Sequence, residues 1–134
     1  MRDEVAAAHA AARRGTEVLA FLDDMEERFA AADLVLSRSG ATTCAELTAA
    51  GRAAVLVPFA RAADDHQRVN ARALESAGAA RMIEEKDLTG ESLAKAIVEL
   101  IETPGRIEAM EEAARRLGRP DAAARVADLL EGAR

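Results

Sequence analysis

The feature that most constrains the fold is a regular alternation between short apolar runs and longer stretches with helical spacing. Four apolar runs of strand length occur, at 17–22, 34–37, 53–59 and 80–84. Strands that alternate with helices of about 10–15 residues are typical of βαβ units, because a parallel strand needs a long crossover. Such crossovers are right-handed, so helices cover both faces of the sheet. The sequence therefore predicts an α/β fold with three layers around a parallel sheet.

Glycines and small polar residues mark where the expected helices begin and end. A glycine in the left-handed conformation closes many helices, and an Asp, Ser or Thr side chain caps the free amides of a first turn. Thr103 is expected to cap one helix with Pro104 at its first position, where a missing N–H is tolerated. The expected helices are 2–14 before Gly15, Asp23 or Asp24 to Ala32, 42–50 before Gly51, 65–77 before Gly78, and three more that begin after Thr89, after Thr103 and near Pro120.

Four strands are fewer than a doubly wound sheet usually has. Such sheets commonly contain about five or six strands, and this sequence begins on an expected helix with no strand before it. We therefore expect residues 1–134 to form a single, partial domain. Its first strand is expected to be absent or to be supplied by another chain.

The composition excludes several classes of function. The net charge is -6, the chain has three Phe and no Trp or Tyr, and the basic residues are scattered. Because nucleic-acid binding usually requires a basic surface and often aromatic stacking residues, no nucleic-acid partner is expected. The single cysteine, Cys44, forms no internal disulfide, which fits a reducing, cytoplasmic setting. No apolar run reaches the roughly 18 residues of a membrane span.

A polar loop with a glycine, "SRSGATT", follows the second apolar run. Ser39 and Gly40 are expected to form a tight turn, after which the free amides and the Thr42 and Thr43 hydroxyls of the next helix point outward. Amide donors and the helix dipole favour negative charge, so this arrangement suits a diphosphate. Glu46, one turn further, can accept hydrogen bonds from vicinal hydroxyls such as those of a ribose. The alternative is an ordinary helix start followed by an exposed glutamate.

A second polar loop, "ARAADDHQRVNA", follows the third apolar run. The groups at Asp65, His66, Gln67 and Asn70 offer donors and acceptors for several hydroxyls, as sugar recognition requires. Ligands of open α/β sheets bind beyond the carboxyl ends of the strands, so both loops are expected to line one site. The alternative is a capped, solvated helix start.

A third segment, "FLDDM", ends the first apolar run. Phe21 can pack on a flat base, and the backbone of Leu22 can pair with the edge of that base. A core Phe beside a capping Asp is the alternative interpretation. Taken alone, this segment decides nothing about ligand binding.

The three segments together resemble the donor-binding half of the MurG family. These are the peptidoglycan transferases that move N-acetylglucosamine from UDP-GlcNAc to lipid I. The resemblance runs from about residue 21 to the C-terminus and rests on the order of "FLDDM", "RSGATTCAE", "AG", "VPF" and "DHQRVNA". It implies the C-terminal half of a GT-B glycosyltransferase, in which two Rossmann-like domains enclose the site.

Carried over by position, the resemblance implies a donor pocket. The Leu22 backbone would read the uracil edge, with Phe21 and Met25 nearby. Glu46 would accept from the ribose hydroxyls, and Gln67, with His66 beside it, would contact hydroxyls of the GlcNAc ring. The remaining donor-binding positions are Arg38, Ser39, Gly40 and Asn70, which shape the pocket, Ala41, Thr42 and Thr43 on the diphosphate side, and Cys44 and Ala45 within the same motif.

The chain also departs from the family pattern. The first strand, its glycine-rich loop and the whole N-terminal acceptor domain are absent, and no catalytic base is identifiable. No cofactor is implied, and the Asp pairs at 23–24 and 64–65 are better explained as helix caps than as a metal site. The resemblance implies UDP-GlcNAc as ligand, lipid I as acceptor through the missing domain, and a peripheral position on the cytoplasmic face of the inner membrane.

These departures leave three hypotheses open. The chain is the donor half of an inverting glycosyltransferase and is inactive alone. It is instead a separate donor-binding subunit of a split GT-B enzyme, using UDP-GlcNAc or another UDP-sugar. Or it is a nucleotide-binding module with no role in transfer.

Overall fold

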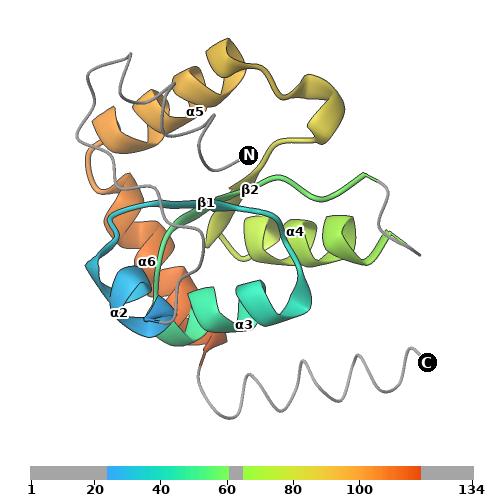
Figure 1. Cartoon of the computed structure of the whole chain (residues 1–134). Helices are drawn as coiled ribbons and strands as arrows, with labels where there is room; N and C mark the ends of the chain where they lie inside the picture. The colour runs from blue at the N-terminus through green and yellow to red at the C-terminus, as the bar shows by residue number, and fades with distance from the viewer. Residues whose placement is uncertain (1–23, 61–64, 119–134) are drawn as a thin grey trace.

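A computed structural model of the chain describes residues 24–60 and 65–118, and its centre is a parallel sheet (Figure 1). Within these residues the sheet has three strands in the order β1-β2-β3: β1 (Val35–Ser37), β2 (Ala54–Leu56) and β3 (Ala80–Met82). Both pairs are parallel, and the register aligns Leu36 with Val55 and Val55 with Arg81. The predicted α/β fold with a parallel sheet is confirmed.

Helices follow each strand and cover both faces of the sheet. Figure 1 shows α5 on one side of the sheet and α3 and α4 on the other, with α6 at the end away from the starts of α3 and α4. The helices are α2 (Met25–Ala31), α3 (Ala41–Ala50), α4 (His66–Ser76), α5 (Gly90–Glu102) and α6 (Arg106–Leu117), with a short 3-10 helix, η2, at Glu85–Asp87.

Two apolar clusters lie on the two faces of the sheet. One combines Leu47 of α3 and Leu74 of α4 with Leu56 of β2. The other places Ala96 and Leu100 of α5 against Val55 of β2. All three residues of β2 are buried, as expected for a strand with helices on both faces.

Several predicted helix boundaries are confirmed. Gly51 ends α3 in the left-handed conformation, with φ 67°. Thr89 caps α5 in a capping box, because its hydroxyl accepts from the Ser92 amide while the Ser92 hydroxyl accepts from the Thr89 amide. Gly78 follows α4 with φ 86°.

The predicted start of α6 at Thr103 is wrong. The Thr103 hydroxyl donates to the Glu99 carbonyl and ends α5, and Gly105 is the residue that precedes α6. The Arg106 amide donates to the Thr103 carbonyl, and Gly105 has φ 76° and ψ -2°. With Pro104 at its second position, this is the pattern of a type II turn, in which glycine is favoured at the third position.

Asp side chains were also expected to cap helices; Asp24 and Asp65 do not, and Asp23 and Asp64 lie outside the described residues. Asp24 precedes α2, but its carboxylate accepts from Arg28 at 3.1 Å. Asp65 precedes α4 with φ 60°, and its carboxylate accepts from Arg68 at 2.8 Å. In both cases an arginine three or four residues further along the chain takes the carboxylate that a free amide would have used.

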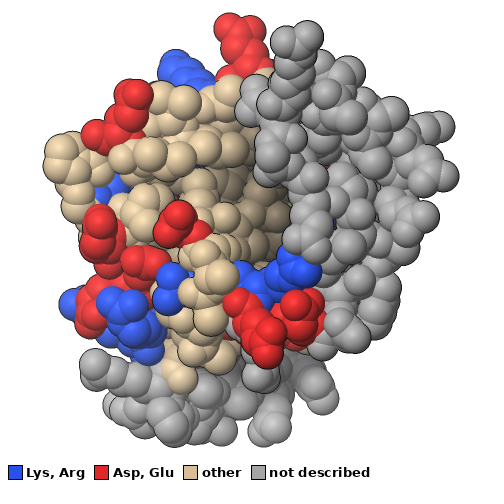
Figure 2. Space-filling model, turned by 60° about the vertical axis from the view of Figure 1, so that its left-hand side comes forward, with Lys and Arg blue, Asp and Glu red and all other residues tan. Residues whose placement is uncertain are grey.

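Some expectations lie outside the described residues. These are the helix at 2–14, the strand at 17–22 and the helix that begins near Pro120. Each of the three described strands is shorter than its apolar run, with three residues paired in each. On the face shown in Figure 2, acidic and basic side chains lie side by side, and uncharged residues form a broad area above them.

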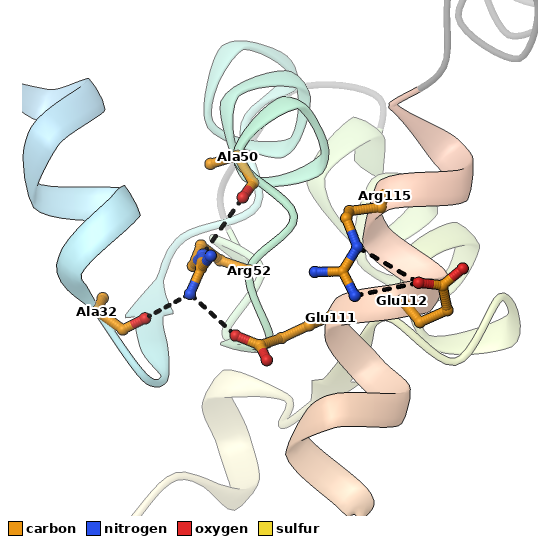
Figure 3. A network of polar contacts seen from close by, with 6 residues as sticks. All are labelled: Ala32, Ala50, Arg52, Glu111, Glu112 and Arg115. Atoms are coloured by element: carbon orange, nitrogen blue, oxygen red, sulfur yellow. Dashed lines mark hydrogen bonds and ion pairs between the residues drawn. The ribbon is translucent and has the colours of Figure 1, made fainter.

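The amino-terminal end of the sheet is closed by an arginine. Arg52, just before β2, donates to the carbonyls of Ala32 and Ala50 and pairs with Glu111 of α6 at 2.9 Å (Figure 3). This contact ties the ends of α2 and α3 to α6. The helices are thereby fixed at the end of the sheet opposite the two polar loops.

Candidate functional site

The two polar loops lie together at the carboxyl end of the sheet. The residues after β1 and those that start α4 are joined by two hydrogen bonds. The Ser39 hydroxyl donates to the Gln67 carbonyl at 2.7 Å, and the Asn70 side-chain amide donates to the Ser39 carbonyl at 3.0 Å. Ser39 is fully buried. Ser39 and Asn70 therefore hold the loops together, and their polar groups are used within the protein.

The side chain of Gln67 is oriented by the backbone of the loop that follows β2. Its side-chain oxygen accepts from the Phe59 amide at 2.8 Å. Because an amide N–H can only donate, this contact assigns the oxygen and leaves the Nε2 group facing elsewhere. A Cβ placed on Gly40 would lie 4.0 Å from that nitrogen. The Gln67 amino group thus lies beside the start of α3 as a hydrogen-bond donor.

The first turn of α3 has amides without a side-chain cap. Gly40 is the N-cap residue, and the first turn has no acidic residue. The first N–H in this region with a carbonyl partner is that of Cys44, which donates to Gly40. The amides of Ala41, Thr42 and Thr43 precede it, and Ala41 and Thr42 are exposed. Gly40 has φ -64°, so the bend needs no glycine-only conformation.

The following residues of α3 divide between core and surface. Glu46 is half-buried in the second turn, and Ala45 is exposed. Cys44 is buried in the core cluster, and burial raises the pKa of its thiol to about 11. The thiol is therefore protonated at neutral pH, and its side chain faces the core.

Arg38 is held by partners that the sequence did not indicate. Its guanidinium pairs with Glu85 of η2 at 2.7 Å and lies over the Phe59 ring at 5.4 Å. It also reaches the Val57 carbonyl at 3.5 Å. Glu85 in turn accepts from the Ala60 amide at 3.4 Å. The exposed Phe at the end of an apolar run was the available sequence signal, whereas nothing in the sequence distinguished Glu85 from other acidic residues.

A small cavity lies beside these groups. It has a volume of about 140 Å³, and Phe59, Asp65, Arg68 and Glu84 are among the residues that line it. Arg68 pairs with both Asp65 and Glu84, at 2.8 and 2.9 Å. The cavity is therefore walled by ion pairs at the ends of β2 and β3.

The other predicted site residues are placed as follows. His66 is the first residue of α4 and is exposed. Met25 is the first residue of α2, and 37% of it is exposed. Phe21 and Leu22 lie outside the described residues.

Residues 24–60 and 65–118 contain neither a candidate metal site nor a membrane-spanning helix. This part of the chain contains no cluster of three or more His, Cys, Asp or Glu residues that could hold a metal ion. Nor does any of its helices have the length and apolar character needed to cross a membrane.

The sequence matches a family model along most of its length. The model describes the glycosyltransferase family 28 C-terminal domain, and it matches residues 3–126. Two curated relatives carry the name UDP-N-acetylglucosamine--N-acetylmuramyl-(pentapeptide) pyrophosphoryl-undecaprenol N-acetylglucosamine transferase. The relative from Myxococcus xanthus is 55% identical over 113 residues, which are 84% of this chain and 30% of the relative. The relative from Anaeromyxobacter sp. Fw109-5 is 52% identical over 128 residues, which are 96% of this chain and 34% of the relative.

Two solved structures resemble the fold. The crystal structure of Acinetobacter baumannii MurG matches with a TM-score of 0.72 and 37% identity, over 87% of this chain and 33% of that one. The structure of the glycotransferase of kitacinnamycin matches with a TM-score of 0.59 and 28% identity, over 86% of this chain and 29% of that one. This chain spans about a third of the length of the relatives and structures it matches.

Proposed function

The chain belongs to the glycosyltransferase family 28 C-terminal domain family, and from this premise we propose that it is a UDP-GlcNAc-binding domain. In this proposal residues 1–134 are one partial domain of a GT-B glycosyltransferase. The whole enzyme transfers GlcNAc to lipid I and so forms lipid II for the peptidoglycan. The names of the relatives support this choice of donor and acceptor.

The observation that carries the proposal is that the uncapped start of α3 lies next to the oriented side-chain amide of Gln67. The first-turn amides of α3 have no side-chain cap, and the Nε2 group of Gln67 lies beside Gly40. Amides at a helix start bind phosphate oxygens well, because several N–H groups and the helix dipole act together. A side-chain amide next to them can donate to a sugar hydroxyl attached through that phosphate.

Each residue of the site has a role in this proposal. The amides of Ala41, Thr42 and Thr43 hold the diphosphate, and Glu46 accepts from the ribose hydroxyls. Gln67 donates to the GlcNAc ring with His66 beside it. Ser39, Gly40 and Asn70 shape the pocket, and Arg38 borders it. Phe21, Leu22 and Met25 form the uracil side of the pocket, whereas we assign no ligand contact to the Cys44 side chain or to Ala45.

The chemistry of this domain is stabilisation of the leaving group. An acceptor hydroxyl attacks the anomeric carbon with inversion, and the bond to the UDP oxygen breaks. Negative charge then grows on the diphosphate, where preorganised amides stabilise it more strongly than mobile water does. We assign no general base to this chain, so the remaining part of the enzyme must supply it. The chain alone is therefore inactive, and its place on the inner membrane depends on that part.

The test is ligand-observed NMR of the purified chain with UDP-GlcNAc, UDP-glucose and UDP. Saturation transfer to the uridine and GlcNAc protons is expected for the native chain, with transfer to the ribose protons strongly reduced in Glu46→Ala. Glu108→Ala, which removes an exposed carboxylate from α6, is the matched control and should behave as the native chain does.

Two results would contradict the proposal. One is the absence of saturation transfer from a folded native sample to any of the three ligands. The other is GlcNAc transfer to lipid I by the chain alone, since that would require a base within it.

A further inference from the structure

The orientation of the Gln67 side chain depends on one backbone amide. Its oxygen accepts from the Phe59 amide at 2.8 Å, and this bond leaves the Nε2 group beside Gly40. Phe59 belongs to the loop that follows β2, whereas Gln67 is the second residue of α4. The direction of the Nε2 donor therefore depends on how residues 58–60 are held relative to α4.

Apolar packing contributes little to holding this loop. Val57 is buried in the core cluster beneath α5, but 42% of Phe59 is exposed. The cavity of about 140 Å³ lies against Pro58, Phe59 and Ala60. Because atoms that border a void lose their dispersion contacts on that side, residues 58–60 must be positioned mainly by polar contacts.

Glu85, the first residue of η2, supplies these polar contacts. Its Oε1 atom pairs with the Arg38 guanidinium at 2.7 Å, and its Oε2 atom accepts from the Ala60 amide at 3.4 Å. Arg38 in turn lies over the Phe59 ring at 5.4 Å and reaches the Val57 carbonyl at 3.5 Å. One carboxylate thus holds the loop directly through Ala60 and indirectly through Arg38, on both sides of the Phe59 amide.

The preceding acidic residue holds the start of α4. Glu84 pairs at 2.9 Å with Arg68, which is the residue after Gln67. Glu84 and Glu85 are consecutive, so the segment between β3 and η2 is bonded both to α4 and to the loop after β2. The two partners of the bond between Phe59 and Gln67 are therefore fixed to the same short segment.

We propose that Glu85 is a positioning residue that raises the selectivity of the site for UDP-GlcNAc over UDP. It acts through residues 58–60 on the direction of the Gln67 donor. The inference rests on the proposed function, in which that donor contacts the sugar ring. UDP has no sugar ring, so its affinity should not fall when Glu85 is replaced.

The first test needs no ligand. Proton–nitrogen correlation NMR of the full chain follows the Phe59 backbone amide and the Gln67 side-chain amide. In Glu85→Ala the Phe59 amide proton should shift upfield and exchange faster with solvent, because its bond to Gln67 is loosened. Glu85→Gln keeps an oxygen acceptor and should leave both signals close to their native positions. Glu91→Ala removes an exposed carboxylate from the first turn of α5 and is the matched control, with both signals unchanged.

The second test is calorimetric titration of the same variants with UDP-GlcNAc and UDP. In Glu85→Ala the ratio of UDP-GlcNAc affinity to UDP affinity should fall about fivefold, the scale of one weakened hydrogen bond. Glu85→Gln should recover most of the native ratio, and Glu91→Ala should equal the native chain. The ratio cancels any change in the diphosphate contacts that both ligands share, so a general loss of structure does not imitate this result.

Three outcomes would overturn the inference: unmoved Phe59 and Gln67 signals in Glu85→Ala, an unchanged affinity ratio in that variant, or no recovery in Glu85→Gln. Far-UV circular dichroism checks that Glu85→Ala is folded. A folded native chain that binds neither ligand would contradict the proposed function, and the selectivity with it. The NMR signals would then still decide whether Glu85 orients Gln67, so the two failures are distinguishable.

Discussion

The two ends of the sheet use their polar groups in different ways. At the amino-terminal end, the Arg52 guanidinium has three protein partners, and α6 is held close against α3 (Figure 3). At the carboxyl-terminal end, Ser39 and Asn70 join the loops, but the first turn of α3 has no side-chain cap. The amino-terminal end is held by hydrogen bonds within the chain, whereas at the carboxyl-terminal end the first-turn amides of α3 have no side-chain cap.

This difference, together with the proposed function, assigns stability to one end of the sheet and ligand binding to the other. A substitution at the amino-terminal end should change the free energy of unfolding and leave ligand affinity alone once the protein is folded. A substitution of a donor at the carboxyl-terminal end should do the reverse. The predictions below test that separation, beginning with the largest effect.

Gly118→Ala should disrupt the packing of α6 on α3 at the amino-terminal end of the sheet. A Cβ there would clash with the Thr48 carbonyl oxygen, so α6 must move away from α3. Overpacking of this kind against backbone should lower the free energy of unfolding by about 3 kcal/mol. Urea denaturation measures it. Gly90→Ala is the control, because nothing lies within 4 Å of that Cβ, and its stability should be unchanged or slightly higher. Equal stability of the two variants would contradict the close packing of α6 on α3.

Arg52→Ala should weaken the same end without a steric clash. It leaves the Glu111 carboxylate, which is mostly buried, without its 2.9 Å partner, and it removes two donors from carbonyl groups. Loss of charged hydrogen bonds of this kind should cost about 2 kcal/mol of unfolding free energy. The control is Arg115→Ala, which removes an exposed pair with Glu112 and should cost less than about 1 kcal/mol. Similar losses in both variants, measured by urea denaturation, would show that Arg52 has no special role.

Gln67→Glu tests the carboxyl-terminal end of the sheet, where we expect a change in ligand affinity. A glutamate oxygen can still accept from the Phe59 amide, but the Nε2 donor is lost. The ratio of UDP-GlcNAc affinity to UDP affinity should fall about tenfold, which equals about 1.4 kcal/mol. Calorimetric titration with each ligand gives the ratio, and the unfolding free energy should stay close to that of the native chain. An unchanged ratio would remove Gln67 from the sugar side of the site.

The smallest effect is expected from Glu99→Gln, away from both ends. The hydrogen bond from Arg81 is the main cause that lowers the pKa of Glu99 below its ordinary value of 4.5. A lowered pKa means that the folded state favours the carboxylate. The ion pair therefore adds stability above the ordinary pKa of Glu99, and this contribution is lost as the pH falls through the lowered pKa of the folded state. Native and variant melting temperatures should therefore differ slightly at pH 7 and converge well below pH 4.5. A difference that persists at low pH would exclude this explanation.

Residues at helix ends show how far local sequence could be read. Gly51 and Thr89 were predicted correctly, because a left-handed glycine and a capping box depend on neighbours within a few positions. Thr103 was misassigned because the same hydroxyl can cap the next helix or donate back to the previous one. The choice depends on the turn at Gly105 that leads into α6.

The candidate site shows the same division. The sequence indicated that two polar loops would meet, since the carboxyl ends of parallel strands share one edge. It could not indicate that the Ser39 hydroxyl donates to the Gln67 carbonyl, or that the Asn70 amide donates to the Ser39 carbonyl. Nor could it indicate that Glu85 of η2 fixes Arg38, because that partner is distant in sequence and has no distinguishing pattern.

The sequence by itself determined the α/β fold class, the alternation of strands and helices along the chain, and the two polar loops of the candidate site. These follow from periodicity and short-range capping, which act between close neighbours. Only the tertiary structure decided that Cys44 faces the core, that Gln67 presents a donor, and that Leu36 of β1 is half exposed. Those outcomes depend on contacts between distant segments, whose geometry exists only once the helices have packed on the sheet.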